Sequence, residues 1–258
     1  MRSMMVATTF IRLLAEDDKT AALAEAVGAV NAGRWVEDVY LVDPESFRQV
    51  PNTPFCYWVS EPIRRLFVEL PQFESEERTA QQGASTKDDF RFVRVWWEVP
   101  AMQILDAANG PDWRDDLKCF QEWCRKRTFE GKRWVLFAKG GAYSSFYADV
   151  YLVVNWEKDA DELEEYLLGR YPYLGCNANW VLHRESDYFR PGLTWTKRAA
   201  RFNPWPLPAG CIFSERAYTA FVLKEDLLSA YAILNSKLWD FLFKTMPSVP
   251  MKGETPTS

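Results

Sequence analysis

The segment GLTWTKRAARFNPWP, residues 192–206, places an Asn-Pro dipeptide among aromatic rings and three cations. Enzymes that methylate the amino group of an extruded adenine use Asn or Asp, then Pro-Pro, then an aromatic residue. In that arrangement a polar side chain and a backbone carbonyl accept hydrogen bonds from the amino group, and the ring stacks on the base. Asn203, Pro204 and Trp205 therefore suggest chemistry on a nucleobase as a first hypothesis.

The order of residues in this segment departs from that motif. Trp205 precedes Pro206, so the second proline and the aromatic residue are exchanged. A glycine-rich strand–loop–helix for S-adenosylmethionine does not precede the segment, and its spaced prolines predict an extended chain. A surface that contacts DNA without catalysis is therefore favoured over a catalytic site. A core-packed turn with solvated cations remains the third interpretation.

Other catalytic motifs are missing from the sequence. Neither GxxxxGK[ST] nor GxGxxG occurs. Lys139 with Gly140 and Gly141 indicates a tight turn between two strands, or a backbone and lysine contact to a phosphate. The single histidine, His183, lacks the GxSxG segment that a Ser-His-Asp hydrolase would need.

A nuclease metal site is the enzymatic alternative, and it ranks last. Asp88, Asp89 and Asp149 could hold a metal, and Asp149, Glu157 and Lys158 come nearest to a nuclease motif. However, the Glu is adjacent to the Lys, so the PD-(D/E)xK spacing is not met. Five cysteines without a CxxC pair, together with one histidine, give no zinc pattern. We therefore expect neither a catalytic residue nor a metal site in this chain.

Composition indicates a globular protein with a sizeable core. Hydrophobic residues make up 48% and charged residues 26%, and aromatic residues reach 16% with 12 Trp. A net charge of −5 argues against a non-specific DNA coat but allows a local basic face. Cations gather in three groups: Arg91 and Arg94; Arg125, Lys126, Arg127, Lys132 and Arg133; Arg184, Arg190, Lys197, Arg198 and Arg201. For the second group a solvated helix face is the favoured interpretation.

Apolar runs in the sequence fall short of the roughly 18 residues that a membrane span needs. A secretion signal is not recognisable either. We therefore expect a cytoplasmic protein with reduced thiols and no membrane partner.

Periodicity and turn residues predict the order of elements. Helices are expected at 5–32, 60–70, 110–131, 159–171 and 224–246. Strands are expected at 90–100, 132–141 and 146–156, with two more in 210–223. The polar segment 72–89 is expected to be a linker.

These elements predict an α+β fold in which an N-terminal helical segment precedes a mixed α/β domain. The expected divisions are a helical linker or helper region at 1–80, a DNA target-recognition domain at 81–246 and a disordered tail at 247–258.

Three parts of the chain, taken in order, resemble a known family. They are 43–67, then 83–100 with 134–156, then 188–242. Together they are similar to the C-terminal half of PglX-like adenine-specific DNA methyltransferases of BREX phage-defence systems. Those enzymes are in turn related to single-chain type II restriction-modification enzymes.

The resemblance implies that this region recognises the DNA target. The family's methyl-transferring half carries the glycine loop for S-adenosylmethionine (SAM) and the Asn-Pro-Pro-aromatic motif, and this chain has neither. SAM is therefore expected as the cofactor of that other half, with no cofactor in this chain. A family motif G-x-x-T-G-D-D-x-R-F-x-R matches residues 83–94, with Lys87 where a small residue is usual. The GLTW segment matches 192–195, and Trp205 replaces a usual arginine.

Double-stranded DNA is the expected partner, and a separate methyltransferase half or defence-system subunit is a further candidate. The residues expected to contact DNA are Thr86, Lys87, Arg91, Arg94, Lys139, Tyr143, Trp195, Lys197, Arg198 and Arg201. A non-enzymatic interaction subunit that docks such a partner is the main alternative, followed by a gene fragment without activity.

Overall fold

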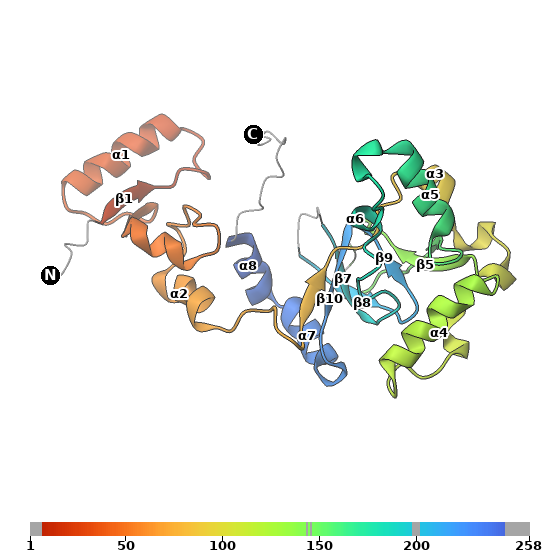
Figure 1. Ribbon diagram of the computed structural model, residues 1–258. Coiled ribbons are helices and arrows are strands. Elements are labelled where there is room, and N and C mark those ends of the chain that lie inside the picture. The colour runs from red at the N-terminus through yellow and green to blue at the C-terminus, as the bar shows by residue number, and fades with distance from the viewer. Residues whose placement is uncertain (1–6, 143, 145, 198–201, 246–258) are drawn as a thin grey trace. The chain divides into compact units, whose positions relative to one another are not determined.

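The computed structural model describes residues 7–142, 144, 146–197 and 202–245 (Figure 1). It has helices and mixed sheets, which confirms the α+β class. The chain divides into two compact units, residues 1–72 with 241–258, and residues 73–240. We call them unit 1 and unit 2.

Unit 1 begins with a strand where the sequence predicted a helix. β1 (Thr8–Ile11) pairs antiparallel with β2 (Val39–Val42), and α1 (Lys19–Asn31) lies between them in the chain. The prediction of one helix over 5–32 is therefore wrong in its first half. Threonine and isoleucine in β1 favour extended backbone, and the Asp18 carboxylate caps α1 by accepting the amides of residues 20 and 21.

The remainder of unit 1 packs a small core of its own. It contains η1 (Pro44–Gln49) and α2 (Glu61–Glu69), and α2 confirms the helix expected at 60–70. Arg64 of α2 is buried, donates to the Val59 carbonyl and faces the Phe47 ring. The buried apolar residues are Val42, Phe47, Val50, Cys56 and Val59.

Unit 2 contains two four-stranded sheets. The first has the order β4-β6-β5-β9, in which β5 and β9 are parallel and the other pairs antiparallel. The second has the order β3-β10-β7-β8 and is antiparallel throughout. The strands are β3 (Thr79–Gln81), β4 (Val93–Val95), β5 (Trp134–Ala138), β6 (Leu152–Asn155), β7 (Gly192–Thr196), β8 (Trp205–Leu207), β9 (Ile212–Phe213) and β10 (Ala217–Phe221).

The longer helices follow the sequence prediction closely in the middle of the chain. The expected helices at 110–131 and 159–171 are present as α4 (Leu117–Phe129) and α5 (Asp161–Arg170). Asp116 begins α4 by accepting the Cys119 amide. The other helices are α3 (Asp89–Phe92), α6 (Asn179–Leu182), α7 (Leu227–Leu234) and α8 (Lys237–Thr245), with 3₁₀ turns η2 (Trp96–Glu98), η3 (Ala101–Gln103), η4 (Ala107–Asn109), η5 (Pro172–Leu174) and η6 (Lys224–Asp226).

Three predicted elements are shorter or broken in the structure. The strand expected at 90–100 is reduced to β4, because Asp88 caps the short helix α3 ahead of it. The expected linker 72–89 contains β3, which pairs with β10. The helix expected at 224–246 is two helices, α7 and α8, separated at Asn235–Ser236.

Gly140 and Gly141 do not form a tight turn between neighbouring strands. β5 and β6 are antiparallel neighbours, as the sequence predicted, but residues 139–151 form a longer connection between them. The predicted extended chain after Asn203 is present as β8. The expected disordered tail at 247–258 lies outside the described residues.

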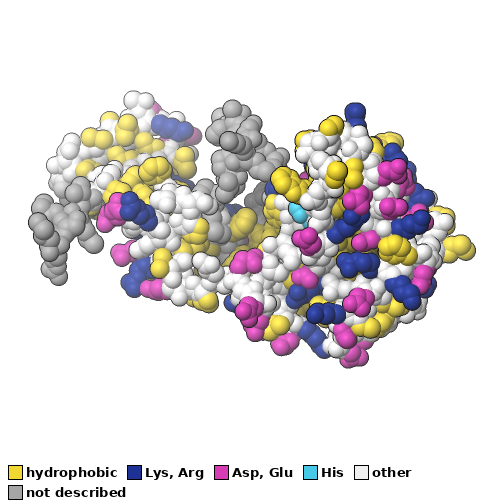
Figure 2. All heavy atoms as spheres, in the orientation of Figure 1, with side chains coloured by type: hydrophobic (Ala, Val, Ile, Leu, Met, Phe, Trp, Pro, Cys, Tyr) yellow, Lys and Arg dark blue, Asp and Glu magenta, His cyan; other side chains and the backbone are white. Residues whose placement is uncertain are grey.

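Charged side chains on unit 2 are mixed in sign. On the face shown in Figure 2, Lys and Arg side chains alternate with Asp and Glu. In the cation group on and after α4, Arg125 pairs with Asp159 at 3.5 Å, and Arg127 pairs with Glu130 at 2.5 Å. These pairs are partly solvated and contribute little to stability. The second cation group is therefore a neutralised helix surface.

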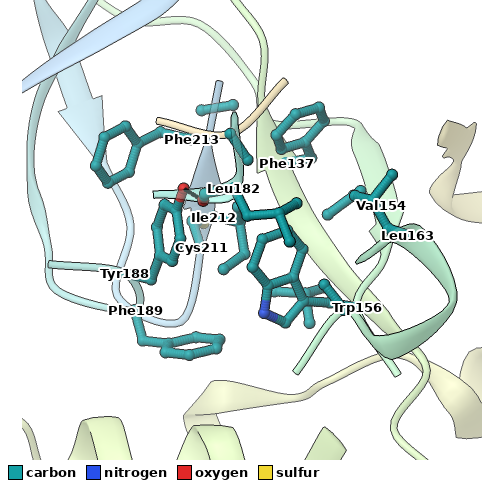
Figure 3. Packing of buried hydrophobic residues seen from close by; sticks show 14 of the residues in the cluster. Phe137, Val154, Trp156, Leu163, Leu182, Tyr188, Phe189, Cys211, Ile212 and Phe213 are labelled. Atoms are coloured by element: carbon teal, nitrogen blue, oxygen red, sulfur yellow. Dashed lines mark hydrogen bonds between the residues drawn. The ribbon is translucent and has the colours of Figure 1, made fainter. Parts of the chain in front are cut away.

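The core of unit 2 lies around Trp156, Tyr188 and Phe213 (Figure 3). The Trp156 and Tyr188 rings meet edge to face at 5.4 Å, and Tyr188 and Phe213 do so at 5.1 Å. The polar groups of Trp156 and Tyr188 both have hydrogen-bond partners. The Trp156 indole N–H donates to the Asp159 carboxylate, and the Tyr188 hydroxyl donates to the Leu182 carbonyl. This core fixes the ends of β5 and β9.

Gly83 packs directly against the backbone of β9. A β-carbon at this position would lie 1.9 Å from the Phe213 carbonyl oxygen. We expect Gly83→Ala to lower the free energy of unfolding of unit 2 by about 3 kcal/mol, because neither backbone can move without disturbing the core. Chemical denaturation followed by tryptophan fluorescence measures this change.

Gly169→Ala is the matched control within unit 2. Gly169 lies in α5 and has open space around it. We expect this substitution to be neutral or to stabilise by up to about 1 kcal/mol, because alanine loses less backbone entropy in a helix. Equal destabilisation by both substitutions would contradict the close approach at Gly83.

Candidate nucleic-acid interface

A polar pocket of about 310 Å³ lies where both sheets of unit 2 meet the loop before α3. The parallel strands β5 and β9 both end at this pocket, and ligands of open sheets commonly bind beyond the carboxyl ends of such strands. Its lining residues are Ala84, Ser85, Thr86, Lys87, Asp89, Phe137, Lys139, Ser214, Glu215 and Arg216.

Backbone hydrogen bonds hold the three segments of the pocket together. The Ala84 amide donates to the Phe213 carbonyl, and the Glu215 amide donates to the Ala84 carbonyl, each at 3.0 Å. The Ser214 amide donates to the Ala138 carbonyl at 2.9 Å. The pocket therefore rests on main-chain contacts between segments that are far apart in the sequence.

Asp89 stands at the centre of the pocket's polar network. Thr86 donates its hydroxyl to one carboxylate oxygen at 2.5 Å, and the Lys139 ammonium forms an ion pair with the other. Partial burial by itself would raise the pKa of Asp89. The hydrogen bonds from Lys139 and Thr86, with the charges of Lys139 and Arg216, outweigh burial and leave that pKa lowered.

Two further cations line the pocket. Lys87 has a left-handed backbone with φ of 55° and forms a loose ion pair with Glu215 at 3.7 Å. Arg216 is exposed, and its amide donates to the Ser214 hydroxyl. Lys87 replaces a small residue of the family motif, and its positive φ lies in the region that favours glycine, so a lysine at this position costs backbone strain.

Lys197 and the loop after Lys139 join the same region. The Lys197 amide donates to the Arg216 carbonyl at 2.9 Å, and its ammonium lies 5.0 Å from the centre of the Tyr218 ring. Thr196, at the end of β7, accepts the Gly141 amide at 3.1 Å. The structure therefore brings together three of the residues expected to contact DNA in one pocket, namely Thr86, Lys87 and Lys139. Lys197 is joined to the wall of that pocket through its backbone amide.

Other expected residues have different surroundings. Arg91 pairs with Glu162 at 3.1 Å and lies over the Phe92 and Tyr166 rings. Arg94 donates to the carbonyls of Phe90 and Val93 and lines a second hollow beside the pocket.

Trp195 packs rather than projects. Its ring contacts those of Phe202 and Tyr218, at centroid distances of 5.2 and 6.3 Å. The last three expected contacts, Tyr143, Arg198 and Arg201, lie outside the described residues.

Sequence reasoning missed Ser214, Glu215 and Arg216. The prediction treated this tripeptide only as a turn between two strands. The strands belong to different sheets, so the turn faces the pocket instead of closing a hairpin. The charged pair Glu215 and Arg216, at a turn between two buried strands, could have indicated that this turn lines a polar site.

The Asn-Pro segment is built into the structure of unit 2. Asn203 is only 5% exposed, and its amide donates to the Ser144 carbonyl at 2.7 Å. The Pro204 carbonyl accepts from Asn235 at 3.0 Å. Asn203 is buried, and the Pro204 carbonyl that would accept from a base amino group already accepts from Asn235, so the geometry favours a structural role.

The described helices include none that is long and apolar enough to cross a membrane.

Buried thiols lie in both units, and burial raises the pKa of Cys124 and Cys211 to about 12. Nucleophilic use of either buried thiol near neutral pH is therefore disfavoured.

The Asp89 network gives a pH-dependent prediction. A carboxylate whose pKa is lowered by folding contributes stability above its unfolded pKa, and this contribution is lost as pH falls through the folded pKa. We expect Asp89→Asn to destabilise unit 2 at pH 7 and to have a much smaller effect at about pH 3, below the ordinary pKa of aspartate. Thermal unfolding of both proteins at the two pH values measures this, and an equal difference at both would contradict it.

Comparison with known proteins relates the chain to one methyltransferase. No protein-family model matches the chain. The chain is similar to the adenine-specific methyltransferase PglX of Lacticaseibacillus casei (strain Zhang), with 25% identity over 207 residues and 77% of this chain covered. The chain spans about 15% of the length of that relative. The similarity supports a PglX-like relationship and links the chain to the methyltransferases.

Proposed function

We propose that this chain is a DNA target-recognition region of an adenine-N6-specific, SAM-dependent methyltransferase of a phage-defence or restriction-modification system. Methyl transfer would depend on residues outside these 258. The observation that carries the proposal is the pocket in which Thr86, Lys87 and Lys139 converge with Arg216, within a chain similar to an adenine-specific methyltransferase.

The pocket offers the groups that read base edges. The Asp89 carboxylate can accept from the amino group of adenine or cytosine, and Lys139 or Arg216 can donate to the N7 and O6 atoms of guanine. Lys87 and Lys197 are placed beside these groups, where they can contact phosphates. The site thus combines contacts that specify with contacts that position.

The acidic balance of the chain limits how binding can occur. A net charge of −5 provides no long-range attraction to DNA, so affinity must come from local contacts. The Asp89–Lys139 and Lys87–Glu215 pairs neutralise much of the pocket before DNA arrives. We therefore expect moderate affinity and discrimination that depends on base contacts.

Salt dependence tests the phosphate contacts. Two cations, Lys87 and Lys197, predict a slope of about −2 for log affinity against log salt on duplex DNA, since each phosphate contributes about −0.9. Lys87→Gln should weaken binding on all sequences and reduce the slope by about 1. Fluorescence anisotropy with a mixed-sequence duplex between 50 and 200 mM salt, roughly the range over which such binding weakens, measures both.

Lys118→Gln serves as the matched control, because Lys118 is an exposed cation on α4 outside the pocket. We expect its slope and affinity to equal those of the unaltered chain. Binding that is insensitive to salt, or equal losses in both variants, would count against this interface.

A methyl-transfer assay tests whether this chain recognises DNA without catalysing methyl transfer. The chain alone, with duplex DNA and methyl-labelled SAM, should transfer no label to adenine, because Asn203 is buried and the sequence has no glycine-rich loop for SAM. Scintillation counting of the recovered DNA measures the transfer. Incorporation that disappears in Asn203→Ala would overturn the assignment of catalysis to other residues.

Docking of a separate methyltransferase or defence protein is the second candidate function. The exposed apolar side chains of Leu228 and Ile233 on α7 favour it, because a partner could bury them and remove their apolar surface from water. Stable co-purification with such a partner, without DNA binding by the chain alone at micromolar concentration, would favour docking over direct recognition.

A further inference from the structure

Phe90 is almost completely exposed, with a relative solvent exposure of 95% for the residue. Its neighbour Phe92, on the same short helix α3, is fully buried in the core. An exposed apolar residue is common on protein surfaces and by itself indicates nothing. The surroundings of Phe90 are what make it informative.

The backbone beneath Phe90 is held firmly. Asp88 caps α3 through the Arg91 amide, and the Phe92 amide donates to the Asp88 carbonyl. The guanidinium of Arg94 donates to the Phe90 carbonyl at 2.6 Å. A ring on such a support loses little backbone entropy when it inserts into a partner.

A second hollow, of about 500 Å³, lies beside Phe90 and adjoins the polar pocket. Asp89 and Lys139 line both, so their ion pair forms the ridge between them. The walls of the second hollow combine apolar and charged side chains, namely Phe90, Val93, Val95 and Leu152 with Asp89, Arg94, Glu98 and Lys139.

The ridge carries a small net positive charge beside apolar side chains, because four cations and three carboxylates line the two hollows. Lys87, Arg94, Lys139 and Arg216 face three carboxylates in the two hollows. Those carboxylates already have partners: Asp89 binds Thr86 and Lys139, Glu98 accepts the Val95 amide, and Glu215 pairs with Lys87.

We propose that Phe90 inserts into the base stack of duplex DNA, at the step next to the base pair whose edge faces Asp89 and Lys139. The inference rests on the proposed function, because it requires DNA at the polar pocket. Apolar side chains that enter a base step unstack it and unwind the duplex locally. Pyrimidine–purine steps open most easily, so we expect them to be preferred.

DNA unwinding gives a readout that does not require the recognised sequence. The whole chain is added to relaxed plasmid with a type I topoisomerase, and the topoisomers are resolved by electrophoresis after removal of protein. Insertion should leave the plasmid negatively supercoiled in proportion to the protein bound. Binding to a mixed-sequence duplex is measured in parallel by fluorescence anisotropy.

Phe90→Ala should abolish the topoisomer shift and weaken binding roughly fivefold to tenfold, in keeping with the loss of one stacking contact. Phe90→Trp should retain the shift. Phe129→Ala is the matched control, since Phe129 is also exposed and lies at the end of α4. We expect it to change neither measurement by more than about twofold. Because Phe90 is exposed, all variants should keep the unfolding temperature of the unaltered chain.

The outcomes separate this inference from the proposed function. Binding without a topoisomer shift, or a shift that persists in Phe90→Ala, would overturn insertion while leaving DNA recognition in place. If the unaltered chain binds no duplex DNA at micromolar concentration, both fail. If Phe90→Ala loses only the capture of a protein partner, the ring belongs to a docking surface and insertion is wrong.

Discussion

The site depends on one backbone junction, where residues 83–84 lie against the end of β9. Gly83 has no side chain to separate it from the Phe213 carbonyl. The Ala84 amide donates to that carbonyl, and the Ala84 carbonyl accepts from the Glu215 amide. Thr86 and Lys87 follow this junction on one side, and Glu215 and Arg216 follow it on the other. The junction therefore holds these two sides of the polar pocket against each other.

The electrostatic character of unit 2 is one of internal compensation. Cations that look like basic clusters in the sequence are largely paired, as Arg91 is with Glu162 and Arg127 with Glu130. The pocket itself follows this pattern through Asp89 and Lys139. A nucleic acid that binds there must exchange partners with existing pairs, and this exchange favours correct base contacts over mere charge attraction.

Local sequence signals predicted the elements whose causes are local. The Asp116 cap and the amphipathic pattern gave α4, and the β-branched run before Asn155 gave β6. The failures have non-local causes. β1 exists because it pairs with β2, some 30 residues later.

The same distinction applies to the site. Thr86 and Lys87 were predicted through the family resemblance, and Lys139 from the adjacent glycine pair. Arg216 was not predicted, because its position depends on a turn between different sheets. Side-chain contacts such as that of Asn203 with Ser144 also depend on the assembled fold.

That turn has a mechanical consequence. Ile212–Phe213 belongs to one sheet and Ala217–Phe221 to the other, so only residues 214–216 carry the chain between them. Because these residues also form one wall of the pocket, a rotation of one sheet against the other changes the width of the pocket directly. A packing substitution far from the pocket that changes the angle between the sheets would therefore also change which ligands fit the pocket.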